Sequence, residues 1–442
     1  MSLTNGRQAR GFDGGGFVRS PGLLGLSLVL AIAAGGNSLT AAQTPVAFSG
    51  VEQQTPAPPE PQIGGAPPAT RQAAIEEQQA AKNRSLGVYK PTKGERIFRR
   101  ADELISGSTI KWHPFFQSAY SGGGFTLGVG RATPVSAYNY IDARASYSIA
   151  GYKRAEVEFI APRMFNRRGE LSVLGGWREA TQVGFHGVGI NTTEDQRTNY
   201  SFKQPYGSAL FSIFPTRKIF MLGAGIEYSN WNLGPGRGSY PSIETAYAPE
   251  ELPGIDADVT YLHNQVTIGI DWRTSPGYTR RGGLYSATLH QYNDRDDRYG
   301  FQMVQYEAVQ HVPIVRETWV LSFHGRVQSS IDKVGQETPF FMLPALGGGS
   351  TLRGYTSRRF HDRNTLLLQA EWRIMINRYL DMAFFYDTGK VAPTRSQLDL
   401  NGLKDDFGIG FRFHGPFSTP LRVELAKSRE ALIFVFTTAA PF

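Results

Sequence analysis

The sequence predicts an all-β fold: a 16-stranded antiparallel transmembrane β-barrel with one long extracellular loop, preceded by a signal peptide and a disordered linker. Three observations predict it. From residue 108 to 442, apolar and polar residues alternate with period two. The alternating segments number sixteen, and long and short connections follow one another in turn. An even strand number is typical of bacterial outer-membrane barrels and keeps both chain ends on the periplasmic side.

The alternation gives each predicted strand one oily face and one charged face. Within 363–377 the even positions include Leu368 and Trp372, whereas the odd positions include Glu371 and Arg373. Successive side chains of a strand point to opposite faces. Charges opposite a continuous apolar face suit a lipid-facing exterior and a wet lumen. A soluble β-sandwich would instead bury the apolar face, and it would explain neither an export signal nor the unequal connections.

The predicted strands cover most of the chain after residue 110. Their ranges are 111–120, 124–133, 138–149, 152–163, 168–182, 199–214, 217–231, 261–273, 283–293, 298–313, 316–329, 363–377, 379–391, 403–414, 419–428 and 431–442. The long connections 183–198, 232–260 and 330–362 fall on one side of the predicted barrel. Short turns fall on the other side, as expected for extracellular loops over periplasmic turns.

The first 42 residues have the layout of a secretory signal peptide. Basic residues precede an apolar run from Leu23 to Ala34, and small residues before Gln43 offer a cleavage site. A transmembrane anchor is the alternative, but a run of about a dozen apolar residues is short of the roughly 20 that a spanning helix needs. The segment 1–42 is therefore expected to direct export.

Two segments separate the signal from the barrel. Residues 43–92 are rich in Pro, Gln and Ala, which predicts an extended, disordered linker. Residues 93–107 predict a short amphipathic helix, because Ile97, Phe98 and Leu104 share one helical face. This helix could pack against the barrel rim, or Lys93–Ser106 could bind a periplasmic assembly partner.

The composition excludes several kinds of site. The chain has no cysteine, which removes disulfides and thiolate metal sites. The net charge is +8, but no block of like charges points to nucleic acid. The eight histidines are dispersed, without the H-E-x-x-H spacing of a metal site. We expect no metal, no cofactor and no catalytic residue, although a hydrolase site assembled from distant strands would leave no local motif.

The most distinctive stretch runs from Pro339 to Arg363. It contains a glycine run, 347–349, followed by Arg353-Gly354-Tyr355. A connection of this length is usually functional or disordered. Its apolar residues favour an ordered loop; they are Phe340, Phe341, Leu343, Leu346, Leu352, Tyr355 and Phe360. A phosphate-binding loop finds no support, because the G-x-x-x-x-G-K-[ST] spacing and its lysine are absent.

The sequence of this stretch resembles the bacterial surface antigen family of outer-membrane barrels. That family belongs with the BamA/TamA-type assembly factors and the two-partner secretion transporters. The resemblance rests on Pro-Phe-Phe-x-Leu-Pro-x-Leu-Gly-Gly, Leu-Arg-Gly-Tyr and Arg-Phe-x-Asp-Arg-Asn within 339–364. It implies that Arg353, Gly354 and Tyr355 mark the tip of an extracellular loop that folds back into the lumen. The sequence departs from the family in one respect, since 43–107 offers no periplasmic polypeptide-transport-associated domain.

Two further motifs carry the same resemblance. Asp271 and Arg273, followed by Pro276 and Gly282, resemble the family's Asp-x-Arg strand end and its Pro/Gly-rich turn. Phe384 to Gly389 resembles its aromatic-x-Asp-x-Gly strand motif. With the loop, the resemblance covers residues 110–442.

The alternation also predicts a partner for Arg353. Arginine does not deprotonate to escape a confined space, so its charge needs a carboxylate there. Apolar even positions on 379–391 turn Asp387 inward. We therefore predict a bidentate Arg353–Asp387 ion pair, with Glu371 on the neighbouring strand as the second choice.

The resemblance implies insertion or translocation of polypeptides at the outer membrane of a two-membrane bacterium, with membrane lipids and unfolded outer-membrane or secreted polypeptides as partners. It also implies a mechanism that uses a weak seam between the first and last strands and no cofactor. The alternative is an outer-membrane pore or binding protein for small solutes or lipids, with the Arg-Gly-Tyr loop as its plug.

Overall fold

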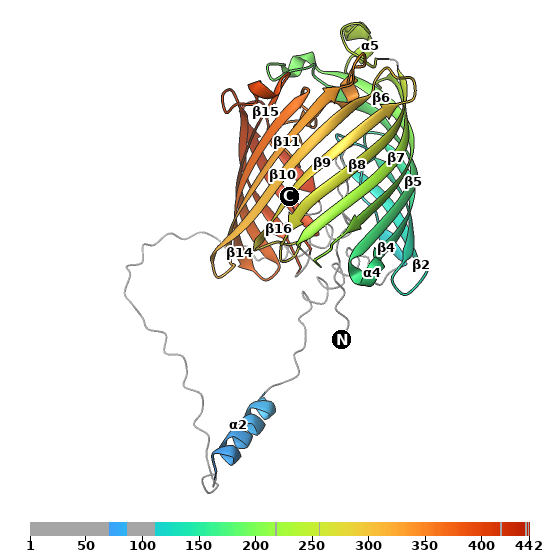
Figure 1. Ribbon diagram of the computed structural model, residues 1–442. Helices are drawn as coiled ribbons and strands as arrows, with labels where there is room; N and C mark the ends of the chain where they lie inside the picture. Colours follow the sequence, from blue (N-terminus) through green and yellow to red (C-terminus); the bar gives the residue numbers. More distant parts are fainter. Residues whose placement is uncertain are drawn as a thin grey trace, which may run out of the picture. The chain divides into compact units, whose positions relative to one another are not determined.

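The computed structural model describes residues 70–85, 111–216, 219–255, 257–415, 418–437, 440 and 442. The described residues fall into two units, a helix within 26–100 and a β-sheet unit (Figure 1). The predicted signal peptide, 1–42, and the predicted amphipathic helix, 93–107, lie outside the described residues. No helix within the described ranges is long and apolar enough to cross a membrane.

Helix α2 (Arg71–Ser85) lies inside the segment 43–92, for which the sequence predicts an extended linker. The extended prediction does not hold for these fifteen residues. Ala, Gln, Glu and Lys, which fill the helix, have high helix propensity. The Thr70 hydroxyl accepts a hydrogen bond from the Ala73 N–H at 3.2 Å, which caps the first turn. Proline marks this linker only up to Pro68 and does not recur before Pro91, which leaves room for a helix.

Sixteen antiparallel strands within the described residues form one continuous sheet in chain order. They are β1 (Trp112–Pro114), β2 (Thr126–Pro134), β3 (Tyr140–Ser148), β4 (Lys153–Arg163), β5 (Gly169–Phe185), β6 (Thr198–Ile213), β7 (Phe220–Pro235), β8 (Asp258–Asp271), β9 (Gly282–Asp294), β10 (Phe301–Val315), β11 (Trp319–Asp332), β14 (Asn364–Asn377), β15 (Leu380–Ala392), β16 (Lys404–Phe413), β17 (Leu421–Ser428) and β18 (Leu432–Thr437). Each predicted segment corresponds to one of these strands, so the all-β, sixteen-stranded prediction is confirmed.

The connections hold short elements. They are α4 (Met164–Arg167), η2 (Glu194–Gln196), α5 (Ile243–Ala246), η3 (Phe340–Met342) and η4 (Arg395–Gln397), together with a separate two-stranded ladder of β12 (Ala345–Leu346) and β13 (Phe360–His361). Three of them, η3, β12 and β13, lie in the loop 339–363. That loop therefore contains regular structure of its own.

The two faces of the sheet differ as the alternation predicts. On β8 the side chains of Val266 and Ile268 are 61% and 60% exposed, whereas Asp271 is buried. On β15 Asp381 and Asp387 are buried and the even positions between them are exposed or partly exposed. The exposed apolar residues form the outer face, and the charged residues line an interior around which the sheet curls (Figure 1). An outer face of this kind suits contact with lipid.

The first and last strands are not joined by a ladder among the described residues, where the sheet begins at β1 and stops at β18. β1 is shorter than the predicted 111–120, and beyond its end Ala119 and Tyr120 pack in the interior. β18 is also shorter than the predicted 431–442. The ring of Phe442 stacks 5.1 Å from His324 on the inner face of β11 and so lies outside the ladder.

Candidate functional site

We call residues 339–363 the arginine loop. Its tip is a set of tight turns closed by backbone hydrogen bonds: the Gly348 N–H donates to the carbonyl oxygens of Leu352 and Tyr355, both at 3.0 Å. Gly347 has φ +120°, and a Cβ there would collide with the carbonyl of Thr356. Only glycine fits such a position. The glycine run therefore shapes the tip.

Arg353 lies at this tip with its side chain 0% exposed. Its Nε and Nη2 donate to the two oxygens of Asp387 at 2.6 and 2.7 Å, which is a bidentate pair. Its Nη1 donates to Glu424 Oε1 at 3.0 Å and to Glu371 Oε2 at 3.3 Å. The guanidinium also stacks 3.6 Å from the ring centre of Phe385. The two carboxylates that the alternation singled out, Asp387 and Glu371, both contact Arg353.

The surrounding carboxylates compensate the buried charge of Arg353. Burial alone would lower the pKa of its guanidinium, but the carboxylates of Asp387, Glu424 and Glu371 raise that pKa well above its usual value. A second arginine shares the same acids, since Arg412 Nη2 donates to Glu371 and, at 2.7 Å, to Glu424. The tip thus completes a buried network of alternating charges. A buried network of this kind is costly to leave half-satisfied.

Gly354 and Tyr355 complete the predicted motif. A Cβ at Gly354 would lie 2.6 Å from the Cβ of Asp406 and 3.0 Å from that of Ser428, so the backbone passes directly against β16 and β17. The Tyr355 hydroxyl donates to the carbonyl of Asp405 at 3.2 Å, and burial raises the pKa of that hydroxyl to about 12. The motif is therefore a backbone contact between two side-chain anchors.

The base of the arginine loop packs against buried aromatic rings on strands far from β15 in the sheet. The rings of Phe340 and Phe185 lie 5.3 Å apart, and those of Phe341 and Trp231 lie 5.2 Å apart. Phe185 and Trp231 belong to β5 and β7, whereas Asp387 belongs to β15. In the sheet order, β8 to β11 and β14 lie between these two groups. The loop therefore crosses the interior from an apolar wall to a charged wall.

A third anchor lies between the two walls. Arg359 donates from Nε to Glu430 at 2.8 Å and from Nη2 to the carbonyl of Thr192 at 2.6 Å. Glu430 stands in the turn between β17 and β18, and Thr192 stands in the connection between β5 and β6. The arginine loop thus ties three separate connections together.

The predicted turn motif lies elsewhere, at the opposite end of the strands. Asp271 Oδ1 accepts hydrogen bonds from the backbone N–H and Nε of Arg273 at 3.2 and 3.1 Å. Gly282 has φ +106°, and a Cβ there would strike the carbonyl of Trp272. Pro276 lies in the turn between them. These four residues shape a local turn and do not touch Arg353.

Sequence reasoning missed several partners of the arginine loop. Glu424 and Arg412 are inward-facing by alternation, but alternation does not say which strands face one another across the interior. The Arg359–Glu430 pair and the two aromatic contacts depend on how the loop is folded, and period two carries no information about a loop. The available signal was the large number of apolar residues in 339–363, which required a surface to pack on.

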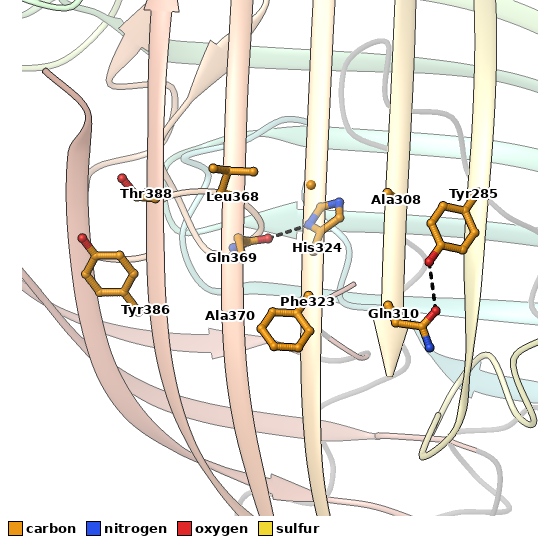
Figure 2. Close-up of a pocket in the computed structure, with 11 residues that line it drawn as sticks. Tyr285, Ala308, Gln310, Phe323, His324, Leu368, Gln369, Ala370, Tyr386 and Thr388 are labelled. Atoms are coloured by element: carbon orange, nitrogen blue, oxygen red, sulfur yellow. Dashed lines mark hydrogen bonds between the residues drawn. The ribbon is translucent and has the colours of Figure 1, made fainter. Parts of the chain in front are cut away.

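Two other features are separate from this site. Within the described ranges, no group of three or more His, Asp or Glu side chains is placed to hold a metal. A hollow of about 300 Å³ opens beside exposed apolar residues of the sheet, among them Phe323, Leu368 and Tyr386 (Figure 2). Beside it the Tyr285 hydroxyl donates to Gln310 Oε1 at 2.9 Å.

Residues 138–431 match the family described as the Omp85 superfamily domain. The structure is similar to a crystal structure of BamA from Haemophilus ducreyi lacking POTRA domains 1–3, at 14% identity and TM-score 0.55, over 72% of this chain and 68% of that one. It also matches CdiB from Escherichia coli, at 11% identity and TM-score 0.49, over 74% of this chain and 62% of that one.

CdiB from Acinetobacter baumannii is matched at 9% identity and TM-score 0.45, over 72% of this chain and 56% of that one. Among curated protein sequences, none matches this chain. At these identities the likeness to solved structures describes the fold alone.

Proposed function

Because the chain belongs to the Omp85 superfamily, it is an outer-membrane protein of a two-membrane bacterium, and we propose that it inserts or translocates polypeptides at that membrane. The family match covers the arginine loop and the strands that hold it, and it agrees with the resemblance to the BamA/TamA-type and two-partner secretion proteins. The match extends over residues 138–431, which include most of the sheet.

One structural observation supports this function most directly. In the described residues no ladder joins β1 to β18, and β1 is only three residues long. Elsewhere in the sheet, neighbouring strands are joined by longer ladders, as between β10 and β11. Unpaired strand edges cannot be satisfied by lipid, so they favour pairing with another strand. A weak seam of this kind is where an incoming polypeptide would add its first strand.

A second proposal concerns a pore for small solutes or lipids with the arginine loop as plug. The observation that favours it is the seating of the loop across the interior, from Trp231 to Asp387. Both functions agree with a closed resting state. They differ in what the opened interior does: a pore passes ions and small solutes, whereas an assembly factor inserts polypeptides into the membrane.

The test is reconstitution. Purified protein in liposomes of outer-membrane lipid would be given a urea-unfolded outer-membrane barrel, and folding of that barrel would be followed by its heat-modifiable gel mobility. We expect faster folding than in empty liposomes, and a loss of other outer-membrane proteins when cells are depleted of this chain. No acceleration and no such loss, together with a steady current in planar bilayers, would favour the pore.

Partners outside the membrane are part of the same proposal. Residues 93–106 remain the candidate contact for a periplasmic assembly partner. Crosslinking from this segment in cells, with identification of the captured proteins, would test that contact.

A further inference from the structure

The connection between β8 and β9 does not point away from the sheet. We call residues 274–281 the tyrosine turn. Tyr278 and Thr279 in it are buried, although the turn follows a strand end and an ordinary hairpin turn would be exposed. Two internal hydrogen bonds fold the turn back on itself: the Tyr278 N–H and the Thr279 hydroxyl both donate to the carbonyl of Ser275, at 3.1 and 2.6 Å. The turn is therefore a compact, ordered unit.

Tyr278 is held by side chains from β15 and from the residue after β16. Its hydroxyl donates to Asp381 Oδ2 at 2.7 Å and accepts from Arg280 Nη2 at 2.7 Å. The ring lies 3.8 Å from that of His414, nearly parallel to it, and His414 Nε2 lies 3.0 Å from the hydroxyl and 3.1 Å from Asp381 Oδ1. The Tyr278 side chain is thus held by stacking on its ring and by hydrogen bonds to its hydroxyl.

Backbone contacts extend this seat to other strands. Arg373 on β14 donates from Nη2 to the carbonyl of Thr279. The Thr419 hydroxyl, just before β17, donates to the carbonyl of Gly277 at 3.0 Å. In the sheet order, β10, β11, β14 and β15 lie between β9 and β16. Because the sheet curls, contacts that skip four strands run across the interior.

The tyrosine turn and the arginine loop lie at opposite ends of the strands. In an antiparallel sheet whose strands follow chain order, the C-terminal ends of β8, β10, β14 and β16 all lie at the same end of the barrel-like sheet. The contacts of the turn lie at that end, including the hydrogen bond from Arg280 Nη1 to the carbonyl of Glu317 at 3.1 Å. The arginine loop follows β11, whose C-terminal end lies at the opposite end of the strands. Each end of the interior therefore has a segment folded across it.

We propose that the tyrosine turn is a second closure of the interior, at the periplasmic end, in series with the arginine loop at the extracellular end. Tyr278 is its latch, and a path through the interior exists only when both segments have left their seats. The orientation of the two ends rests on the proposed function, and the closure itself regulates access to the same interior.

The closure is tested by ion current through single proteins in planar bilayers, which does not depend on polypeptide insertion. Four proteins would be compared with the wild type: Tyr278→Ala, Arg353→Ala, the double variant, and Tyr228→Ala as a matched control. Tyr228 is an exposed tyrosine on the outer face of β7. Folding of each variant would first be checked by its faster gel mobility without boiling, so that a misfolded variant is not scored.

If the two closures act in series, each single variant should conduct ions for nearly as small a fraction of the time as the wild type. The double variant should conduct for at least about tenfold more of the time. Tyr228→Ala should equal the wild type. The proposal is overturned if Arg353→Ala alone conducts as well as the double variant, since the turn would then close nothing. It is also overturned if the double variant stays as silent as the wild type. Tyr278→Phe keeps the stacked ring and loses the hydroxyl bonds, and it should lie between the wild type and Tyr278→Ala when each is combined with Arg353→Ala.

Discussion

Gly354 and Ser428 are in direct contact, with the Ser428 hydroxyl donating to the Gly354 carbonyl at 2.7 Å and no room for a side chain at Gly354. The contact places the tip of the arginine loop against β17 at backbone distance. It explains why an arginine that reaches Asp387 is followed by glycine. A larger residue would hold the backbone away, and the guanidinium would no longer reach both carboxylate oxygens.

The first prediction is that Gly354→Ala displaces the tip. Overpacking at such a site costs about 1–3 kcal/mol. External trypsin acting on whole cells should then cleave the arginine loop, which offers Arg358 and Arg359, several times faster than in the wild type. Gly175→Ala is the matched control, because Gly175 lies within β5 and nothing stands within 4 Å of a Cβ there. Equal cleavage of the two variants would count against the contact.

The second prediction separates charge from geometry at Arg353. Arg353→Ala leaves three carboxylates around an empty site and should cost about 3–5 kcal/mol of docking free energy, the usual cost of breaking a buried pair. Arg353→Lys keeps the charge but cannot form the bidentate pair and the two further bonds at once. The lysine variant should therefore also release the loop, though less fully. Resistance to protease equal to that of the wild type in Arg353→Lys would show that charge alone suffices.

Asp387→Ala should be milder than Arg353→Ala, because Glu371 and Glu424 still contact the guanidinium. Comparing trypsin cleavage rates of the two variants in the same cells provides the measurement. A greater release in Asp387→Ala would place the whole anchor in that single pair.

The third prediction concerns pH. Burial and neighbouring arginines lower the pKa of His186 to about 4 and hold the pKa of His361 well below its usual value. Both histidines are neutral when the arginine loop is seated. A base whose folded pKa is lowered contributes stability above its unfolded pKa of about 6.5 and loses it as pH falls toward the folded value. The loop should therefore loosen between pH 7 and pH 4.

The charged groups that face these histidines are Arg358, Arg359 and Arg197, all of which oppose protonation. A spin label on Ser357→Cys would report the loosening as increased label mobility, and the chain has no native cysteine to interfere. His361→Gln should flatten this pH response while leaving the Arg353 contacts in place. A response unchanged in that variant would assign it to other groups.

The fourth prediction concerns Glu371, which contacts Arg353 and Arg412 and lies 3.9 Å from Arg373 Nε. Arg373 also holds the tyrosine turn through Thr279. Glu371→Gln keeps the shape but removes the charge, and hydrogen bonds to charged groups contribute about 1.5–3 kcal/mol. Amide hydrogen exchange should therefore rise in both the arginine loop and the tyrosine turn. Asp399→Asn removes an exposed carboxylate that pairs with Lys390, and it should change neither segment.

The alternation of apolar and polar residues was sufficient to predict most of the fold. It located all sixteen strands and the inward direction of Asp387 and Glu371, because period two records which face of each strand meets water or charge. It placed the ends of β1 and β18 poorly, since Ala119 and Tyr120 pack inside beyond the end of β1 and Phe442 stacks on His324. Composition also hid α2, where helix-forming residues follow a proline-rich stretch.

The site was less accessible to sequence reasoning than the strands. Arg353 and its two predicted acids came from one motif and one rule about burial of charge. Glu424, Glu430 and Asp381 could not be paired with loop residues, because their contacts cross the interior and depend on the curl of the whole sheet. The inward fold of the tyrosine turn left no local pattern, since Asp381 and Arg373, which hold Tyr278 and Thr279, are more than 90 residues away along the chain.

The central claim, that Arg353 seats the arginine loop inside the sheet, is tested most directly by a disulfide. A Cβ at Gly122 would lie 3.9 Å from the Cβ of Ser357, within the spacing of disulfide-bonded cysteines. Gly122 has φ +88°, so Gly122→Cys alone must first be shown to fold.

In intact outer membranes under mild oxidation, Gly122→Cys/Ser357→Cys should crosslink nearly completely, as read by gel mobility with and without reductant. Adding Arg353→Ala should lower that yield several-fold. A pair that fails to crosslink, or that crosslinks equally well with Arg353→Ala, would contradict the account.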